Sequence, residues 1–301
     1  MLRQTSSHAP FAFAVSPLDI SYYAFADVHG YADAFERLLH QIHEHRLRNP
    51  ARKVRIVGVG DYVNRGPDSR GVMDLLEREI RTAAPGVEWV LLRGNHDVGL
   101  LYLLRARLKP DEEIPATIRS LIDKGGIPTL HSYGVDLHPA PSGKARHIHT
   151  VAGTDLWVGP EQIIRAQQEL LRVIPHAHLR ILTGLRSYYE TRRFFFVHAG
   201  VDPERSLSRQ FERVMLGTDE SVRGFVKYDR KLDKIIVHGH TPTDQPVHNP
   251  AQISIDTGVY KTGRLTGVAL SGETPVFMTA MTDLPRYDKK AALREPQAAL
   301  A

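Results

Sequence analysis

The sequence predicts an α/β fold with a parallel sheet, a second and more antiparallel sheet packed on it, and a helical insertion. Two observations support this prediction. A cycle of strand, polar loop and amphipathic helix occurs three times before residue 110, which is typical of parallel strands joined by helices. Short apolar runs punctuated by glycines return after residue 190, and this pattern is typical of hairpins.

The three cycles follow one another from Ile20. Each begins with an apolar run that predicts a buried strand and ends with apolar residues at helical spacing. The predicted pairs of strand and helix are 20–26 with 33–42, 54–59 with 72–80, and 87–92 with 98–108. In parallel sheets, ligands bind beyond the carboxyl ends of the strands, and all three polar loops fall there.

The remainder of the chain divides into an insertion and a group of late strands. The segment from about 99 to 185 is mostly helical by pattern, and we interpret it as an insertion over the site. Late strands are predicted at 194–197, 235–237, 253–255, 265–270 and 276–279, with hairpin turns at Gly258, Gly263 and Gly272. We predict a loose N-terminal arm (1–18), one catalytic domain (19–284) and a frayed C-terminal tail (285–301).

The composition excludes several classes of protein. The 301 residues are 42% hydrophobic and 24% charged, which excludes a disordered, collagen-like or coiled-coil chain. The absence of cysteine excludes a disulfide framework, a thiolate zinc site and a cysteine nucleophile. No apolar run approaches the roughly 20 residues of a membrane helix, so we expect a soluble, cytoplasmic protein with no membrane partner. A net charge of only +5, with scattered basic residues, argues against nucleic acid as a partner.

Five of the predicted strands end in side chains that can bind a metal. These side chains are Asp27, His29, Asp61, Asn95, His96, His198, His238 and His240. Taken singly, each group has a simpler explanation, such as a helix N-cap at Asn95 or a polar turn at His238. These explanations do not account for five strands that end in the same way. Asp27 and His29 are one residue apart, so in an extended segment both side chains would point the same way.

The ligand types indicate the chemistry. Oxygen and imidazole donors without sulfur suit manganese, iron or zinc. Two metal ions about 3.5–4 Å apart need a bridging carboxylate, and Asp61, after the middle strand, is the natural candidate. Arg65 lies in the same loop and can bind a phosphate through two hydrogen bonds. The combination predicts phosphoester hydrolysis.

At these residues the sequence resembles the phosphoprotein-phosphatase branch of the calcineurin-like metallophosphoesterases, over roughly residues 20–275. The shared motifs, in family order, are Asp27-Val28-His29-Gly30, Gly60 to Ser69, Gly94-Asn95-His96-Asp97, Val197-His198-Ala199-Gly200 and Gly239-His240-Thr241-Pro242. Asp256-Thr257-Gly258 also resembles the end of bacterial members, which include Ser/Thr protein phosphatases and diadenosine tetraphosphatases. The resemblance implies a four-layer fold, in which a two-sheet β-sandwich is flanked by helices and carries the site at its strand ends.

The resemblance also implies two divalent metal ions, with manganese first and iron or zinc as alternatives. Asp27, His29 and Asp61 would hold one ion. The other would be held by Asp61, Asn95, His198 and His240. A metal-bridging hydroxide would attack phosphorus in line, Arg65 and Asn95 would orient the phosphate, and His96 would protonate the leaving oxygen.

The sequence departs from the family pattern at two places. Asn64 stands where relatives normally have an Asp that pairs with the acid His. An Asn can accept a hydrogen bond from the imidazole but cannot stabilise an imidazolium, so we expect slower release of poor leaving groups. A second phosphate-binding Arg of relatives aligns with Thr218 here. Arg223, five residues further on, is the candidate substitute, and a solvated surface arginine is the alternative reading of that residue.

These observations predict a metal-dependent phosphatase of the protein Ser/Thr type, acting on a phosphorylated protein or a small phosphoester. The alternative enzyme is a symmetrical bis(5'-nucleosyl)-tetraphosphatase. Its two nucleosides could use side chains of the insertion, namely Tyr102, Arg105, Arg107, Arg119 and Tyr133. A third hypothesis, suggested by Asn64 and Thr218, is a catalytically impaired phosphate-binding pseudoenzyme. The presence of all six metal ligands weighs against it.

Overall fold

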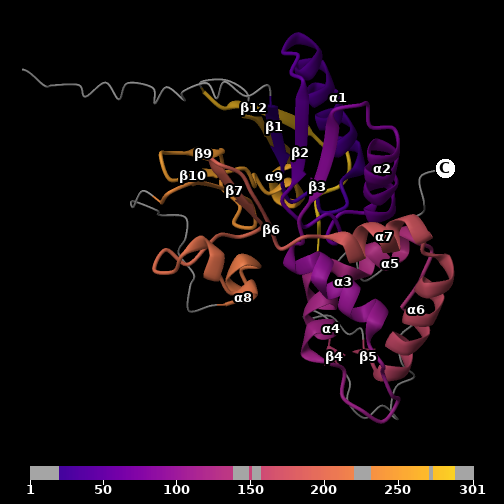
Figure 1. The fold of residues 1–301 in the computed structure, drawn as a ribbon. Helices are drawn as coiled ribbons and strands as arrows, with labels where there is room; N and C mark the ends of the chain where they lie inside the picture. Colours follow the sequence, from indigo (N-terminus) through magenta and orange to yellow (C-terminus); the bar gives the residue numbers. More distant parts are fainter. Residues whose placement is uncertain (1–19, 138–148, 151–156, 220–231, 271–273, 289–301) are drawn as a thin grey trace, which may run out of the picture.

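The three predicted cycles form the parallel part of one sheet. The computed structural model describes residues 20–137, 149–150, 157–219, 232–270 and 274–288 (Figure 1). Strands β1 (Ile20–Phe25), β2 (Lys53–Gly58) and β3 (Val87–Leu91) are parallel neighbours. All three strands lie within one residue of their predicted bounds.

The first sheet packs on helices with one face and on the second sheet with the other. Side chains alternate along β1, so Tyr23 and Phe25 join the core beneath helices α1 (Ala32–Arg48) and α2 (Ser69–Arg81). Ala24 points the other way, into a buried layer that it shares with side chains of the second sheet. This layer contains Val57, Val90, Val268, Phe194, Phe196, Val237 and Ile253.

The second sheet is mixed and has the order β6-β7-β8-β10-β9. Its strands are β6 (Tyr188–Glu190), β7 (Phe194–Val197), β8 (Ile235–His238), β9 (Val247–His248) and β10 (Gln252–Ser254). The three central strands β7, β8 and β10 are parallel, and the edge strands β6 and β9 are antiparallel to them. The two sheets with their flanking helices form the sandwich that the resemblance implies.

The last two strands lie in the other sheet from the one expected. Strands β11 (Arg264–Ala269) and β12 (Val276–Met281) form a hairpin, but β11 pairs with β1 and extends the first sheet. The prediction that the late hairpins build the second sheet is therefore wrong for β11 and β12. Gly258 and Gly263 flank the short helix α9 (Val259–Thr262) instead of marking hairpin turns, and Gly272 lies outside the described residues. A local pattern identifies a strand but does not choose its neighbour.

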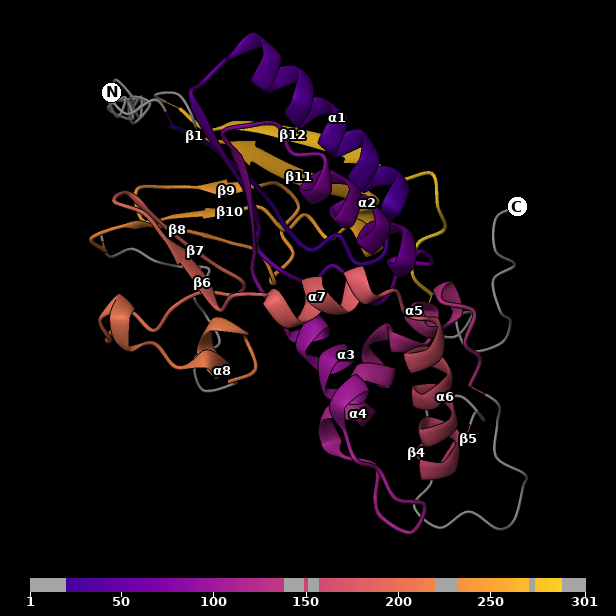
Figure 2. The ribbon, with the colours of Figure 1, turned by 45° about the vertical axis from the view of Figure 1, so that its right-hand side comes forward.

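The segment from 99 to 185 is mainly helical, as predicted, and its helices gather at one end of the molecule (Figure 2). Its elements, including the end of the third cycle, are α3 (Asn95–Arg105), α4 (Ala116–Leu121), a π-helical turn η1 (Ile122–Gly126), α5 (Ile127–Ser132), β4 (His149–Thr150), β5 (Trp157–Val158), α6 (Pro160–Val173) and α7 (His176–Gly184). Between β7 and β8 lie the short helices η2 (Leu207–Arg209) and α8 (Glu212–Met215).

The predicted arm 1–18 and residues 289–301 of the predicted tail lie outside the described residues. Among the helices that are described, none combines the length and apolar character needed to cross a bilayer.

Candidate metal centre and active site

The predicted ligands meet because parallel strands bring their carboxyl ends to one edge of each sheet. The loops after β1 and β2 are joined by backbone hydrogen bonds, with the His29 N–H donating to the Asp61 carbonyl at 2.9 Å. The loops after β7 and β8 are joined in the same way, with the Gly239 N–H donating to the His198 carbonyl at 2.8 Å. The sandwich then places both pairs of loops around Asp61.

Backbone strain is concentrated in these loops. Among the described residues, six that are not glycine have a positive φ, and all six belong to the predicted site: Asp27, His29, Asp61, Asn64, Arg65 and His240. Such a conformation costs on the order of 1–3 kcal/mol per residue and persists only where the surroundings impose it. Asp27 and His29 have φ values of 51° and 48°, so the expectation that they lie in an extended segment is wrong.

Asp61 lies at the centre of the site. Its carboxylate oxygens are 3.6 Å from His29 Nε2 and 3.5 Å from His198 Nε2. His198 Nε2 in turn lies 3.1 Å from His240 Nδ1 and 3.2 Å from Asn95 Oδ1. Two groups of potential ligands share the Asp61 carboxylate: His29, Asp61 and His96 form one group, and Asp61, His198 and His240 form the other. The arrangement suits a carboxylate that bridges two ions.

These spacings fit a metal site. Two ligand atoms that each lie about 2.1 Å from one ion are about 3–3.5 Å from each other. The ring orientations also fit, because His29 Nδ1 lies 3.1 Å from the Val63 carbonyl and His198 Nδ1 lies 3.0 Å from the Val59 carbonyl. Each Nδ1–H donates to its carbonyl, and Nε2 is left with a free lone pair toward Asp61. The residues present therefore fit divalent cations.

The electrostatics of the site also favour cations. Burial raises the pKa of Asp61 to about 7 and the pKa of Asp27 well above its ordinary value. Burial lowers the pKa of His198 and of His240 to about 3, so both imidazoles are neutral at physiological pH. Buried carboxyls beside neutral imidazoles lack the positive charge that a divalent ion would bring.

Asp256 belongs to the Asp256-Thr257-Gly258 motif, for which the sequence predicts no role at the site. Asp256 is buried, accepts a hydrogen bond from the Gly258 N–H at 2.7 Å, and raises the pKa of Asp27 through charge repulsion. Burial raises the pKa of Asp256 itself to about 7. Asp27 accepts the His240 backbone N–H at 3.0 Å and does not join either group of ligands around Asp61. Its role as a ligand stays a prediction.

Metal binding should therefore release protons from carboxyls and not from histidines. We expect the apparent metal affinity to rise with pH up to about pH 7, by about tenfold per unit for each proton displaced, and then to level off. The sign follows because Asp61, with a pKa of about 7, must lose a proton to bind a cation, whereas His198 and His240 are already neutral. Calorimetric metal titrations in buffers of different ionisation enthalpy count these protons. An affinity that stays constant between about pH 5.5 and 7 would contradict the prediction.

Asp97 holds the loop of Asp61 in place. Its carboxylate accepts the backbone N–H groups of Gly94 (2.8 Å), Asp61 (2.8 Å) and Tyr62 (3.0 Å). Gly94 has no side chain because a Cβ there would overlap the Asp61 carboxylate. Burial and the neighbouring Asp61 raise the pKa of Asp97 to about 8, while the three N–H donors lower it. Asp97 thus ties the start of α3 to the loop after β2.

His96 is faced by N–H groups at both ring nitrogens. The Asn64 side-chain nitrogen lies 2.9 Å from His96 Nδ1, and Arg65 Nη2 lies 3.2 Å from His96 Nε2. The Thr129 hydroxyl donates to Asn64 Oδ1 at 3.0 Å, so the amide oxygen already has a partner. The expectation that Asn64 accepts a hydrogen bond from His96 is therefore not what the structure has. Donors on both sides oppose an imidazolium, and burial, followed by the charge of Arg65, lowers the pKa of His96 well below its ordinary value.

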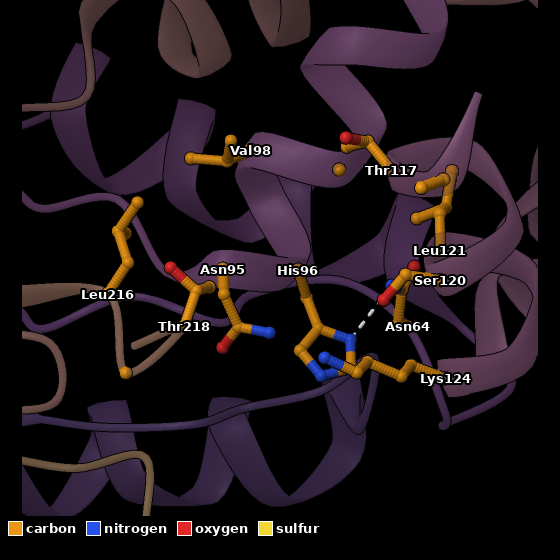
Figure 3. A pocket seen from close by; sticks show the side chains of 13 residues that line it. Asn64, Asn95, His96, Val98, Thr117, Ser120, Leu121, Lys124, Leu216 and Thr218 are labelled. Carbon is orange, nitrogen blue, oxygen red and sulfur yellow. Dashed lines mark hydrogen bonds between the residues drawn. The ribbon is translucent and has the colours of Figure 1, made fainter. Parts of the chain in front are cut away.

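A cavity of about 480 Å³ opens beside His96 (Figure 3). Asn64, Asn95 and Thr218 line it, together with residues of α3 and α4. Arg65 is not among the residues that line it, and its guanidinium lies 3.8 Å from the centre of the Tyr260 ring. Arg223, the predicted second phosphate-binding residue, lies outside the described residues.

Comparisons with known proteins agree with this fold. A crystal structure assigned provisionally as a diadenosine tetraphosphatase superposes with a TM-score of 0.53 at 20% identity, covering 90% of this chain and 99% of that one. The symmetrical bis(5'-nucleosyl)-tetraphosphatase of Delftia acidovorans is 39% identical over 80 residues, which are 26% of this chain. The match spans only 24% of that curated relative's length.

The sequence model of the calcineurin-like phosphoesterases matches residues 20–265, which include strands β1 to β3 of the first sheet, all five strands of the second sheet and the described side chains around Asp61. The chain therefore belongs to the calcineurin-like phosphoesterase family.

Proposed function

We propose that the chain hydrolyses phosphoanhydrides of the dinucleoside tetraphosphate type, cleaving them symmetrically. The observation that carries this proposal is that the two side chains facing the His96 ring nitrogens are the neutral amide of Asn64 and the positive guanidinium of Arg65, and neither stabilises an imidazolium. A serine or threonine alkoxide is a poor leaving group and needs a proton from an acid in the transition state. A nucleoside diphosphate leaves as a stable anion and needs none. The site around His96 suits the second kind of leaving group.

We propose that two divalent ions, manganese first, are held by Asp27, His29 and Asp61 and by Asp61, Asn95, His198 and His240. When bound, the ions supply a Lewis acid that activates water for attack and neutralises charge on the phosphate. The chain supplies the rest. Arg65 is held in place over the Tyr260 ring, where its guanidinium can bind two phosphate oxygens. The Asn95 amide can donate to the same phosphate and so orients it for attack.

The competing candidate is the protein Ser/Thr phosphatase that the sequence analysis places first. The family membership and the ligand set support both candidates equally. The stretch of 80 residues that resembles a symmetrical tetraphosphatase, together with the neutral residue at position 64, favours the dinucleotide.

A comparison of substrates tests the proposal. With Mn²⁺ present, we expect diadenosine tetraphosphate to be hydrolysed to ADP alone, with kcat/KM at least about 10²-fold above that of a phosphoserine peptide, since general acid catalysis contributes about 10²–10⁴-fold. Equal rates for the two substrates would favour the protein phosphatase. ATP and AMP as products would rule out symmetrical cleavage. Two bound metal ions with no turnover of either substrate or of an aryl phosphate would point to the pseudoenzyme.

The variant Asn64→Asp restores a carboxylate beside His96. We expect it to raise phosphoserine hydrolysis by about 10–100-fold, because the carboxylate stabilises an imidazolium that can protonate the alkoxide. Hydrolysis of the dinucleotide should change by less than about threefold. The measurement is the steady-state rate on both substrates. An aryl phosphate, which has an easy leaving group, is the control. If all rates rose by the same factor, the leaving-group explanation would be wrong.

A further inference from the structure

The helical insertion places one lysine in the cavity beside His96. Lys124 lies in the π-helical turn η1, between α4 and α5, where Lys124 (φ −93°, ψ 18°) and Gly125 (φ 92°) depart from helical geometry. The interruption turns Lys124 out of the helix and toward the cavity (Figure 3).

The position of Lys124 is fixed relative to Arg65. The Arg65 backbone N–H donates to the Gly125 carbonyl at 2.8 Å, although 60 residues separate the two in sequence. Gly125 is required at this contact, because a Cβ there would lie 2.8 Å from the Arg65 nitrogen and its φ of 92° is unfavourable for other residues. The backbone thus places two cationic side chains at neighbouring points of the site.

The cavity around Lys124 suits an anion. Thr117, Ser120 and Thr218 contribute hydroxyl groups, and none of the residues that line the cavity in the described ranges is acidic. Within the same ranges, the Lys124 ammonium makes no hydrogen bond or ion pair, so it is available to a ligand. Its charge also acts on His96 and on Asp61, lowering the pKa of both, which agrees with a position close to the metal centre.

We propose that Lys124 binds the phosphate group next to the one under attack, on the leaving side of a polyphosphate chain. The inference rests on the proposed function and adds a residue that distinguishes substrates with one phosphate from substrates with several. Arg65 binds the attacked phosphate, and Lys124 binds its neighbour. Arg223 is not needed for this second contact.

This hydrolysis needs no added acid. Water adds to the attacked phosphorus and loses a proton to solvent, the bridging P–O bond breaks, and its electron pair stays on the terminal oxygen of the leaving diphosphate. The Lys124 ammonium offsets the negative charge that develops there. His96 does not readily donate a proton to this oxygen, because the side chains of Asn64 and Arg65 that face its ring do not stabilise an imidazolium. The Lys124 charge takes the place of that proton.

The test compares diphosphate with orthophosphate as ligands of the Mn²⁺-loaded protein. Calorimetric titrations, with the same excess of Mn²⁺ in cell and syringe, give the dissociation constants, and competitive inhibition of aryl phosphate hydrolysis gives a second measure. In Lys124→Met we expect diphosphate to bind at least about tenfold more weakly, as for the loss of one charged hydrogen bond. Orthophosphate binding and the KM for the aryl phosphate should change by less than about threefold.

Two matched variants serve as controls. Lys124→Arg keeps the charge and should restore diphosphate binding to within about threefold of the unaltered protein. Lys109→Met removes another lysine of the insertion, one that pairs with Glu112 and does not line the cavity, and should have no effect. Thermal melting of each variant checks that it is folded.

An equal loss for orthophosphate and diphosphate, or no loss for either, would overturn the proposal. The proposed function can fail separately. If diadenosine tetraphosphate is not hydrolysed but Lys124→Met still weakens diphosphate selectively, Lys124 binds a second phosphate and the substrate is another polyphosphate.

Discussion

Replacing Asp61 with Asn is expected to reduce aryl phosphate hydrolysis by about 10³-fold or more and to leave the protein unable to hold two metal ions. Asp61 is the residue that both groups of potential ligands share, so its loss affects both at once. The Lewis-acid contribution of a metal site is worth several kcal/mol, and about 1.36 kcal/mol corresponds to tenfold in rate. Metal content by atomic emission and turnover in the presence of Mn²⁺ are the measurements.

The same substitution should not destabilise the metal-free protein. Burial raises the pKa of Asp61 to about 7, so in the metal-free protein the folded state holds this proton more tightly than the unfolded chain does. The ionised carboxylate therefore costs stability as the pH rises from about 4 to 7, and a neutral amide removes that cost. Asp111→Asn, at an exposed acid of the insertion, is the matched control and should keep both activity and metal. Two metal ions retained by Asp61→Asn would refute the bridging role.

Asp97→Ala is expected to lower the free energy of unfolding of the metal-free protein by about 3–5 kcal/mol. The substitution leaves three backbone N–H groups, of Gly94, Asp61 and Tyr62, without their acceptor. Each unsatisfied buried donor costs about 1–3 kcal/mol, and water that enters the vacated space recovers part of this cost. Urea unfolding in the presence of a chelator measures the change.

Asp68→Ala provides the comparison, because the Asp68 carboxylate accepts a single N–H, from Gly71, at the start of α2. Loss of an N-cap of this kind costs about 1 kcal/mol. Asp97→Ala should also weaken metal binding, since Asp97 holds the backbone of Asp61, whereas Asp68→Ala should not. Equal losses of stability in the two variants would mean that the three donors near Asp97 find other partners.

Local patterns predicted most of the elements and failed on one pairing. Apolar runs and helical spacing identified β1, β2 and β3 and the helices that follow them, because burial against a core imposes those periods. The pairing of β11 with β1 was missed. Val268 lies opposite Ala24 in this pair, a contact between residues 244 positions apart. A pattern within β11 contains no information about a neighbour so distant in sequence.

The site shows the same division between what sequence and structure decide. The predicted strand ends identify the candidate ligands, because each ligand follows a strand whose end lies at a known edge of the sheet, and the motifs at these positions identify the family. The orientation of the polar groups around the ligands follows from the tertiary structure alone. The Thr129 hydroxyl donates to the oxygen of the Asn64 amide, so the amide nitrogen faces His96. The Gly125 carbonyl accepts the Arg65 backbone N–H, and this contact places Lys124 in the cavity. These contacts join the loop after β2 to an insertion some 60 residues later, and their direction depends on packing between segments that no local pattern connects.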